Sequence, residues 1–298
     1  MATSTRAFDT VDARPEREFH HPLAVLRRFW RNKTAVAGLT VVFVLAVSAA
    51  LASAILPYNP DTADFNAVLQ GPTPAHLFGT DQLGRDLLTR VVYGGRFSLA
   101  IGVIAVAGAL AIGVPLGLVS GYYGGVVDLV IQRVMDVVLA FPGFLLALTL
   151  ISLLGVGLPN VIISVAVSTM PVYVRLIRGV TLSARELTYV ESARSIGMQD
   201  WRIMLRHVLP NTTAPLIVQS TIQIGVAILT AAGLGFLGLG VKPPTPEWGT
   251  MLGDAVNYLL SSWFIAAFPG LAIFLSVMAF NLLGDGLRDA LDPRMKVL

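Results

Sequence analysis

Six apolar stretches dominate this 298-residue chain, and most are long enough to cross a lipid bilayer as a helix. Lipid offers the backbone no hydrogen-bonding partner, so a crossing segment must be helical and needs about 20 apolar residues. Only 13% of the residues are charged and the mean hydropathy is +0.72. The sequence therefore predicts an all-α integral membrane protein with six transmembrane helices. The predicted spans are residues 35–56, 98–120, 137–154, 161–174, 213–237 and 264–283.

The basic residues predict which side of the membrane each segment occupies, because cytoplasmic loops retain Lys and Arg during insertion. With the N-terminus inside, 17 of the 21 basic residues fall in predicted cytoplasmic segments. Both termini are therefore expected in the cytoplasm. Residues 1–22 are expected to be a disordered tail and residues 291–298 a second cytoplasmic tail. Residues 23–33 are expected to form an interfacial amphipathic helix, or simply a basic flank of the first span.

Several functions are excluded by residue types that the chain or its spans lack. There is no cysteine, which rules out disulfides, thiolate metal sites and cysteine nucleophiles. The predicted spans contain no Asp, Glu, Lys, Arg or His, whereas ion-coupled carriers and intramembrane hydrolases need such groups at depth. None of the three lysines belongs to a P-loop motif, so any ATP hydrolysis must come from another polypeptide. A net charge of +3 argues against a nucleic-acid partner, and a passive channel or scaffold stays open.

The segment between the fourth and fifth spans is predicted to fold as a helix, a turn and a second helix. Residues 182–196 contain good helix formers, and Gly197 can adopt the positive φ that ends a helix. Asp200 is placed to cap the second helix, and Pro210 is expected to end the helical region before the fifth span. A short rigid helix pair of this kind is suited to transmit a push from a soluble partner.

This segment resembles the EAA loop of binding-protein-dependent ABC importer permeases, in which a coupling helix docks on the ATPase subunit. Ser192 stands at the second position of the pattern in place of an alanine, and His207 stands where the pattern has isoleucine. By this resemblance, ATPase coupling is assigned to Glu191, Ser192, Ala193, Gly197, Leu209 and Pro210.

Three further stretches resemble the permeases of the dipeptide, oligopeptide and nickel class, and together they span most of the chain. They are HLFGTDQLGRD at 76–86, FLGLG followed by PPTPEWG at 236–249, and FNLLGD with a later DP pair at 280–293. The resemblance implies a type I, MetI-like permease core of five helices within residues 97–290, containing the EAA-like loop at 191–210. A peripheral first helix within residues 23–96 would complete the six.

The same resemblance implies a non-catalytic permease subunit of an ATP-driven importer in a prokaryotic inner or plasma membrane. Its expected partners are a second homologous permease, two ABC ATPase domains that bind ATP and Mg²⁺, and an extracytoplasmic solute-binding protein. This chain itself is expected to need no cofactor and to contact membrane lipid. Short peptides are the expected substrate, and nickel and glutathione, which similar permeases carry, are the alternatives.

Polar residues on the fifth span form one stripe, because Thr212, Gln219, Gln223 and Thr230 fall within about 40° of each other at 100° per residue. Such a stripe either supplies hydrogen bonds between helices or lines a substrate path. Gln219, Gln223 and Thr230 are therefore predicted as a possible translocation path. Glycines at four-residue spacing on the second span predict close helix packing: Gly113, Gly117 and Gly121.

The predicted outer loops carry mixed charges and aromatic residues. For Asp81, Arg85 and Asp86, mutual ion pairing is favoured over contact with substrate or with the binding protein, since loop carboxylates pair readily. Trp248 and Trp263 are predicted to anchor the outer loops at the membrane interface.

Overall fold

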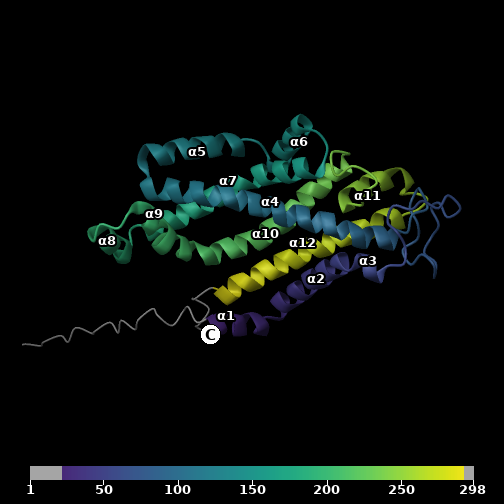
Figure 1. Cartoon of the computed structure of the whole chain (residues 1–298), viewed down its shortest axis with the longest axis horizontal. Helices are drawn as coiled ribbons and strands as arrows, with labels where there is room; N and C mark the ends of the chain where they lie inside the picture. Colours follow the sequence, from purple (N-terminus) through teal and green to yellow (C-terminus); the bar gives the residue numbers. More distant parts are fainter. Residues whose placement is uncertain (1–21, 292–298) are drawn as a thin grey trace, which may run out of the picture.

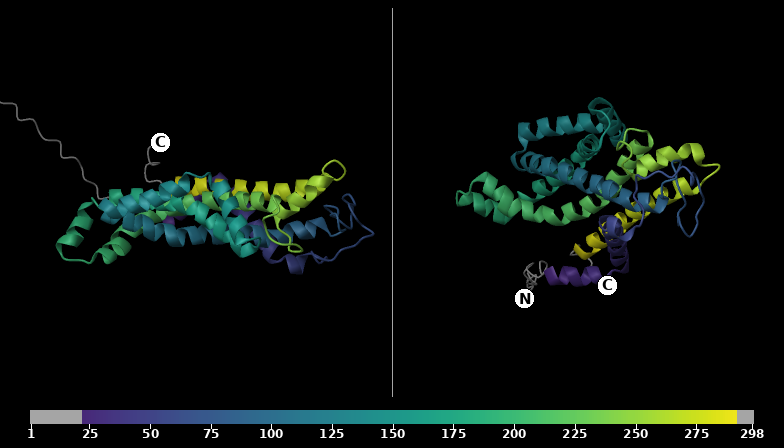
Figure 2. Two further views of the ribbon diagram at one scale, coloured as in Figure 1. Left: turned by 90° about the horizontal axis from the view of Figure 1, so that it is seen from above. Right: turned by 45° about the vertical axis from the view of Figure 1, so that its right-hand side comes forward.

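The computed structural model describes residues 22–291, and this part of the chain is an elongated bundle of helices without a strand (Figures 1 and 2). Helices α8 and α9 extend from one end, and the loop between α3 and α4 lies at the other (Figure 1). The helices are α1 (Pro22–Arg31), α2 (Lys33–Ala50), α3 (Ala52–Ile55), α4 (Leu87–Tyr123), α5 (Gly125–Leu139), α6 (Gly143–Leu154), α7 (Leu158–Ala184), α8 (Thr188–Ser195), α9 (Asp200–Ile203), the π-helical η2 (Met204–Val208), α10 (Leu209–Phe236), α11 (Trp248–Ala255), the 3-10 helix η3 (Val256–Tyr258) and α12 (Phe264–Leu291).

Five straight segments are long and apolar enough to cross a membrane, and α5 with α6 makes a sixth if the bent pair counts as one span. The predicted straight span at 137–154 is wrong, because α5 and α6 meet at 86°. The break falls at Phe141 and Pro142, where proline lacks a backbone donor and disfavours helix in the residue before it. Alone, the 12 residues of α6 reach only about 18 Å.

Two spans are much longer helices than hydropathy predicts. The α4 helix has 37 residues and begins at Leu87, where the Asp86 side chain accepts a hydrogen bond from the Thr89 amide at 2.8 Å. The α7 helix begins at Leu158 and continues to Ala184. The turns that extend α4 and α7 beyond the predicted spans contain arginines. The α4 helix is about 55 Å long and exceeds the ~30 Å hydrocarbon core, so its first turns can lie outside the lipid. The apolar run locates the membrane crossing, whereas the caps decide where the helix ends.

The glycines at four-residue spacing bring α4 and α7 into close contact, as predicted. A Cβ atom on Gly113, Gly117 or Gly121 would lie 2.6–2.8 Å from the Cβ of the facing α7 residue. No side chain larger than hydrogen fits there without separating the helices. The facing residues are Tyr173, Ile177 and Thr181.

A buried ion cluster organises the loop before α4. Asp81 accepts from Arg85 Nε at 2.7 Å and lies 3.3 Å from Arg90 Nε, and each of these three residues is at most 5% exposed. The predicted pairing of Asp81 with Arg85 is confirmed. Asp86 also has a structural role, because its carboxylate caps α4 and lies 3.0 Å from His76 Nδ1 rather than beside an arginine.

The α11 helix is fixed to α4 by two buried side chains. Trp248 is 1% exposed and donates from Nε1 to the Val91 carbonyl at 2.7 Å, so its predicted role as an interfacial anchor is wrong. Glu247 caps α11 and also accepts from Ser98 Oγ at 3.0 Å. Burial raises the pKa of Glu247, and its hydrogen bonds act in the opposite direction. Trp263 is 65% exposed, and its role as an interfacial anchor stays a prediction.

The N-terminal helices lie at the edge of the bundle, where α2 packs along α12 and α1 contacts the same helix (Figure 1). Phe29 is buried in one cluster with Ala35 and Ala290, whereas Trp30 is 59% exposed. The predicted tails fall outside the described residues except at two positions, because Pro22 begins α1 and Leu291 ends α12.

Candidate functional site

The element formed by α8 and α9 projects from the bundle as a bent helix pair. The single helix predicted for residues 182–196 is wrong, because α7 ends at Ala184 and Leu187 is extended before α8. This bend lets α8 fold back so that Val190 and Ala193 are buried against α9 and η2. Burial of these two side chains outweighs the local preference for one continuous helix.

Gly197 ends α8 in the way that the sequence predicts. Its φ is +76°, a left-handed conformation that glycine adopts without strain. The Gly197 amide donates to the Arg194 carbonyl at 2.9 Å, and the Met198 amide donates to the Ala193 carbonyl at 3.1 Å. This pair of hydrogen bonds is a Schellman motif, which fixes the direction in which the chain leaves α8.

Two predictions about the second helix are wrong. Gln199 occupies the N-cap position of α9, and Asp200 is the first helical residue, whose carboxylate accepts from Tyr122 Oη at 2.8 Å. Pro210 does not end the helical region, because α9, η2 and α10 follow each other without a break from Asp200 to Phe236. A proline inside a helix clashes with the carbonyl four residues earlier. The wider π turn at Met204–Val208 is where the helix accommodates it.

The residues assigned to coupling are divided between the surface and the interior. Glu191 and Ser192 are exposed on α8, and Ser192 Oγ donates to the Thr188 carbonyl at 2.8 Å. Ala193 faces inward, and Leu209 and Pro210 lie at the start of α10. The structure therefore places Glu191 and Gly197 on the projecting tip and uses Ala193 to hold that tip in place.

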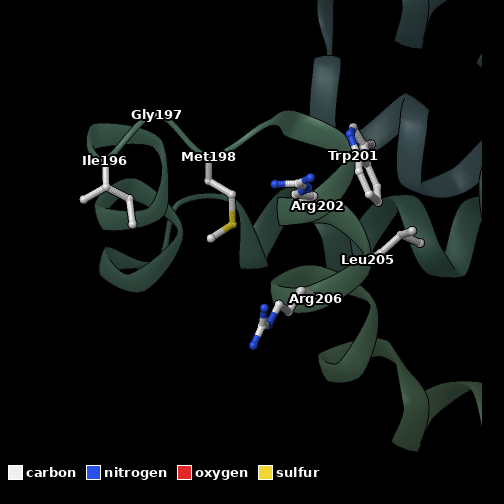
Figure 3. Close-up of a pocket in the computed structure, with 7 residues that line it drawn as sticks. All are labelled: Ile196, Gly197, Met198, Trp201, Arg202, Leu205 and Arg206. Atoms are coloured by element: carbon white, nitrogen blue, oxygen red, sulfur yellow. The ribbon is translucent and has the colours of Figure 1, made fainter.

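A groove of about 660 Å³ opens between the turn at Gly197 and the outer face of α9 and η2. Figure 3 shows Ile196, Gly197 and Met198 on the α8 side, with the remaining lining residues on the facing turns. Ile196 is 79% exposed and Trp201 is 53% exposed. Large exposed apolar side chains beside arginines are typical of a protein-docking surface. The lining residues are Ile196, Gly197, Met198, Trp201, Arg202, Leu205 and Arg206.

Within residues 22–291, no group of three or more His, Asp or Glu residues is positioned to hold a metal ion. The projecting tip presents a grooved surface of exposed apolar side chains and arginines.

Residues 113–297 match the family described as "binding-protein-dependent transport system inner membrane component". The chain belongs to this family. Residues 23–72 also match the N-terminal transmembrane domain of oligopeptide transport permease C. The protein is therefore a multi-pass membrane permease subunit of an ABC importer, with a MetI-like fold.

Curated relatives cover nearly the whole permease. This chain is 48% identical to a glutathione transport system permease protein GsiD from Pectobacterium atrosepticum, over 91% of this chain and 90% of that protein. It is 46% identical to a dipeptide transport system permease protein DppC from Alkalihalophilus pseudofirmus, over 89% of this chain and 88% of that protein. Among solved structures, an inward-facing MetNI methionine ABC transporter matches 69% of this chain and 98% of its own, with a TM-score of 0.54 and 19% identity.

The polar stripe of the permease lies along α10. Thr212 and Thr230 donate from their hydroxyls to carbonyls of their own helix, those of Leu209 and Val226. Gln223 is buried, at 9% exposed, whereas Gln219 lines a groove of about 540 Å³ between α7, α10 and α12. Within residues 22–291, no hydrogen bond joins a threonine of this stripe to another helix. The structure thus places Gln219 beside open space, whereas Thr212 and Gln223 are buried.

Cysteine substitution at Gln219 tests whether this groove is aqueous. We expect Gln219→Cys to react with a membrane-impermeant thiol reagent, because thiols react as thiolates and a thiolate forms in water but not in lipid. The parent chain has no cysteine, so the signal comes from one position. The matched controls are Leu271→Cys on an exposed apolar face of α12 and Ser276→Cys, whose parent side chain is fully buried; neither should react. A Gln219→Cys protein that stays unlabelled in every nucleotide state would remove this residue from the path.

Sequence reasoning missed two kinds of site residue. The groove arginines Arg202 and Arg206 are recognisable as basic residues in the EAA-like loop, but only the fold places them beside Ile196. Tyr122 lies 78 residues before Asp200, and no local pattern connects them.

Proposed function

We propose that this permease imports short peptides, glutathione included, and that its α8–α9 tip is the docking element for an ABC ATPase. The observation that carries the docking role is the exposed groove at Gly197, which combines apolar side chains and arginines on a braced helix pair. The substrate class is supported by relatives whose names refer to glutathione and to dipeptides, at 46–50% identity over about nine-tenths of the chain. Glutathione is itself a small peptide, so the two names describe one chemical class.

In this proposal the α8–α9 end faces the cytoplasm and the loop end faces outward. The excess of Lys and Arg in segments on the α8–α9 side supports this orientation. A second homologous permease and a solute-binding protein would complete the importer. The ATPase domains would bind ATP and Mg²⁺, and this chain would contribute no catalytic residue.

The proposed mechanism is alternating access driven by the partner ATPases. Closure of the ATPase pair on ATP would move the docked α8–α9 tip, which acts as a lever on the bundle. The groove beside Gln219 opens between α7, α10 and α12 near the same end of the bundle, which suits release of substrate into the cytoplasm. Gln219 would then line part of the path.

Affinity capture followed by reconstitution tests the proposal. We expect the permease, purified from its own membranes in mild detergent, to retain a second permease and a P-loop ATPase. In proteoliposomes with the binding protein, the complex should accumulate a labelled dipeptide or glutathione only when ATP is present.

Three results would contradict different parts of this proposal. Recovery of the chain without an ATPase, even after crosslinking through residues 191–210, would remove the docking role. Uptake without ATP would indicate a passive channel. ATP-driven uptake of Ni²⁺ but of neither peptide would replace the substrate class.

A further inference from the structure

One buried tyrosine joins α4 to both halves of the projecting tip. Tyr122 is the penultimate residue of α4 and is 5% exposed. Its hydroxyl donates to Asp200 Oδ1 at 2.8 Å and accepts from Arg194 Nε at 3.2 Å. The Arg194 guanidinium also lies over the Tyr122 ring, 4.8 Å from its centroid, a cation–π geometry.

The two partners of Tyr122 lie on opposite sides of the Gly197 turn. Arg194 is in the last turn of α8, whereas Asp200 is the first residue of α9. The turn between them is exposed, and a Cβ added at Gly197 would meet no atom within 4 Å. Gly197 itself therefore packs against nothing, and Tyr122 connects the segments on either side of it.

The chemistry of this link depends on the hydroxyl group. A phenol can donate one hydrogen bond and accept another, and here it uses both with charged partners. Hydrogen bonds to ionised groups are shorter and stronger than neutral ones. The ring itself packs in a cluster with Val190, Ala193 and Ile203. Phenylalanine would preserve that packing and lose both hydrogen bonds.

The α4 helix extends from this link to the opposite end of the bundle. Its glycine face holds it against α7 by contacts too close for a Cβ atom. Near its first turns it holds α11, through Trp248 to the Val91 carbonyl and through Glu247 to Ser98. A displacement of α8–α9 that reaches α4 can therefore reach α11 through packed helices and hydrogen bonds.

We propose that Tyr122 is a positioning residue that transmits movement of the α8–α9 tip to α4. This inference rests on the proposed docking of an ATPase at that tip. Without the Tyr122 hydroxyl, the tip still docks and ATP is still hydrolysed, but less of the movement reaches the transmembrane helices. Tyr122 therefore determines how much substrate is moved per ATP.

The test compares Tyr122→Phe with the parent in the complete reconstituted importer, measuring both uptake and ATP hydrolysis. We expect substrate moved per ATP to fall at least about fivefold, because two hydrogen bonds to charged partners are lost, while ATP hydrolysis is retained. The matched control is Tyr123→Phe, because Tyr123 is adjacent but 51% exposed, and its ratio should equal that of the parent.

Substitutions at Asp200 provide a second, independent test. Asp200→Asn keeps an oxygen that can accept from Tyr122 and should retain most of the coupling. Asp200→Leu removes the acceptor and should lower the ratio as Tyr122→Phe does. In the double variant Tyr122→Phe/Asp200→Leu, the substrate moved per ATP should fall by less than the product of the two single effects, because both changes break the same link.

A crosslink separates failure of this inference from failure of the docking proposal. Ile196→Cys lies in the groove and is the only cysteine in an otherwise cysteine-free chain. If it crosslinks to the ATPase while Tyr122→Phe retains the parental ratio, the role of Tyr122 is refuted and docking stands. If it gives no crosslink in the parent background, docking itself is refuted, and this inference with it.

Discussion

Replacing Gly197 with valine should lower substrate uptake at least about tenfold while the permease still assembles in the membrane. The left-handed conformation costs an L-residue about 1–2 kcal/mol, and a β-branched side chain fits it least well. The strain comes from φ alone, because a Cβ at this position would meet no neighbouring atom. The tip should therefore change direction without disturbing the core. ATP-driven uptake in proteoliposomes, normalised to the amount of assembled complex, measures the effect.

Two control variants isolate the backbone conformation as the cause. Gly197→Asn should retain most uptake, since asparagine tolerates the left-handed region. Gly179→Ala adds a methyl group where there is open space on α7 and φ is helical, so it should transport as the parent does. If Gly197→Val imports at the parental rate, the conformation of this turn is irrelevant to coupling, and the lever model loses its main support.

Replacing Asp81 with asparagine should give the largest loss of stability, because it leaves two buried arginines without their carboxylate. Asp81 is 3% exposed, and its Oδ2 contacts Arg85 and Arg90. Removing one partner of a buried ion pair costs about 3–5 kcal/mol, since the remaining charge stays desolvated. For a chain of this size the apparent Tm should fall by roughly 6–12 °C. Thermal unfolding of the purified permease in one detergent provides the comparison.

Asp61→Asn is the matched control for this prediction. The Asp61 side chain is 48% exposed and lies 3.9 Å from the same Arg90, so water screens the interaction and the apparent Tm should stay within about 2 °C. Equal stability of Asp81→Asn and the parent would mean that the buried cluster does not hold the outer loop. Loss of uptake at unchanged Tm would instead assign Asp81 to contact with substrate or with a partner.

The apolar runs and the glycine spacing could be interpreted from the sequence because their physical causes are local or periodic. A segment in lipid must satisfy its own backbone hydrogen bonds, which makes helix the only outcome for each run. A glycine at every fourth position defines one smooth face whatever the partner is, and Gly117 indeed meets α7. Likewise, the positive φ of Gly197 follows from the absence of a side chain.

Helix ends and bends were predicted less well, because several rules compete at each of them. Pro210 would end an isolated helix, yet the π turn of η2 lets the chain continue into α10. Phe141 and Pro142 do break the chain, and α5 turns from α6 by 86°. Both segments contain proline, but only Pro210 follows a π turn, so the presence of proline alone does not decide whether a helix breaks.

The sequence by itself determined the helical class of this permease, five of its long apolar helices, the flat face of α4 and the turn at Gly197. Each of these follows from the backbone in lipid or from the properties of one residue type. Only the tertiary structure decided that Asp86 pairs with His76, that Trp248 is buried, and that Tyr122 holds Asp200. Such pairs depend on which helices pack together, and the last joins residues 78 positions apart, so no local pattern carries the information.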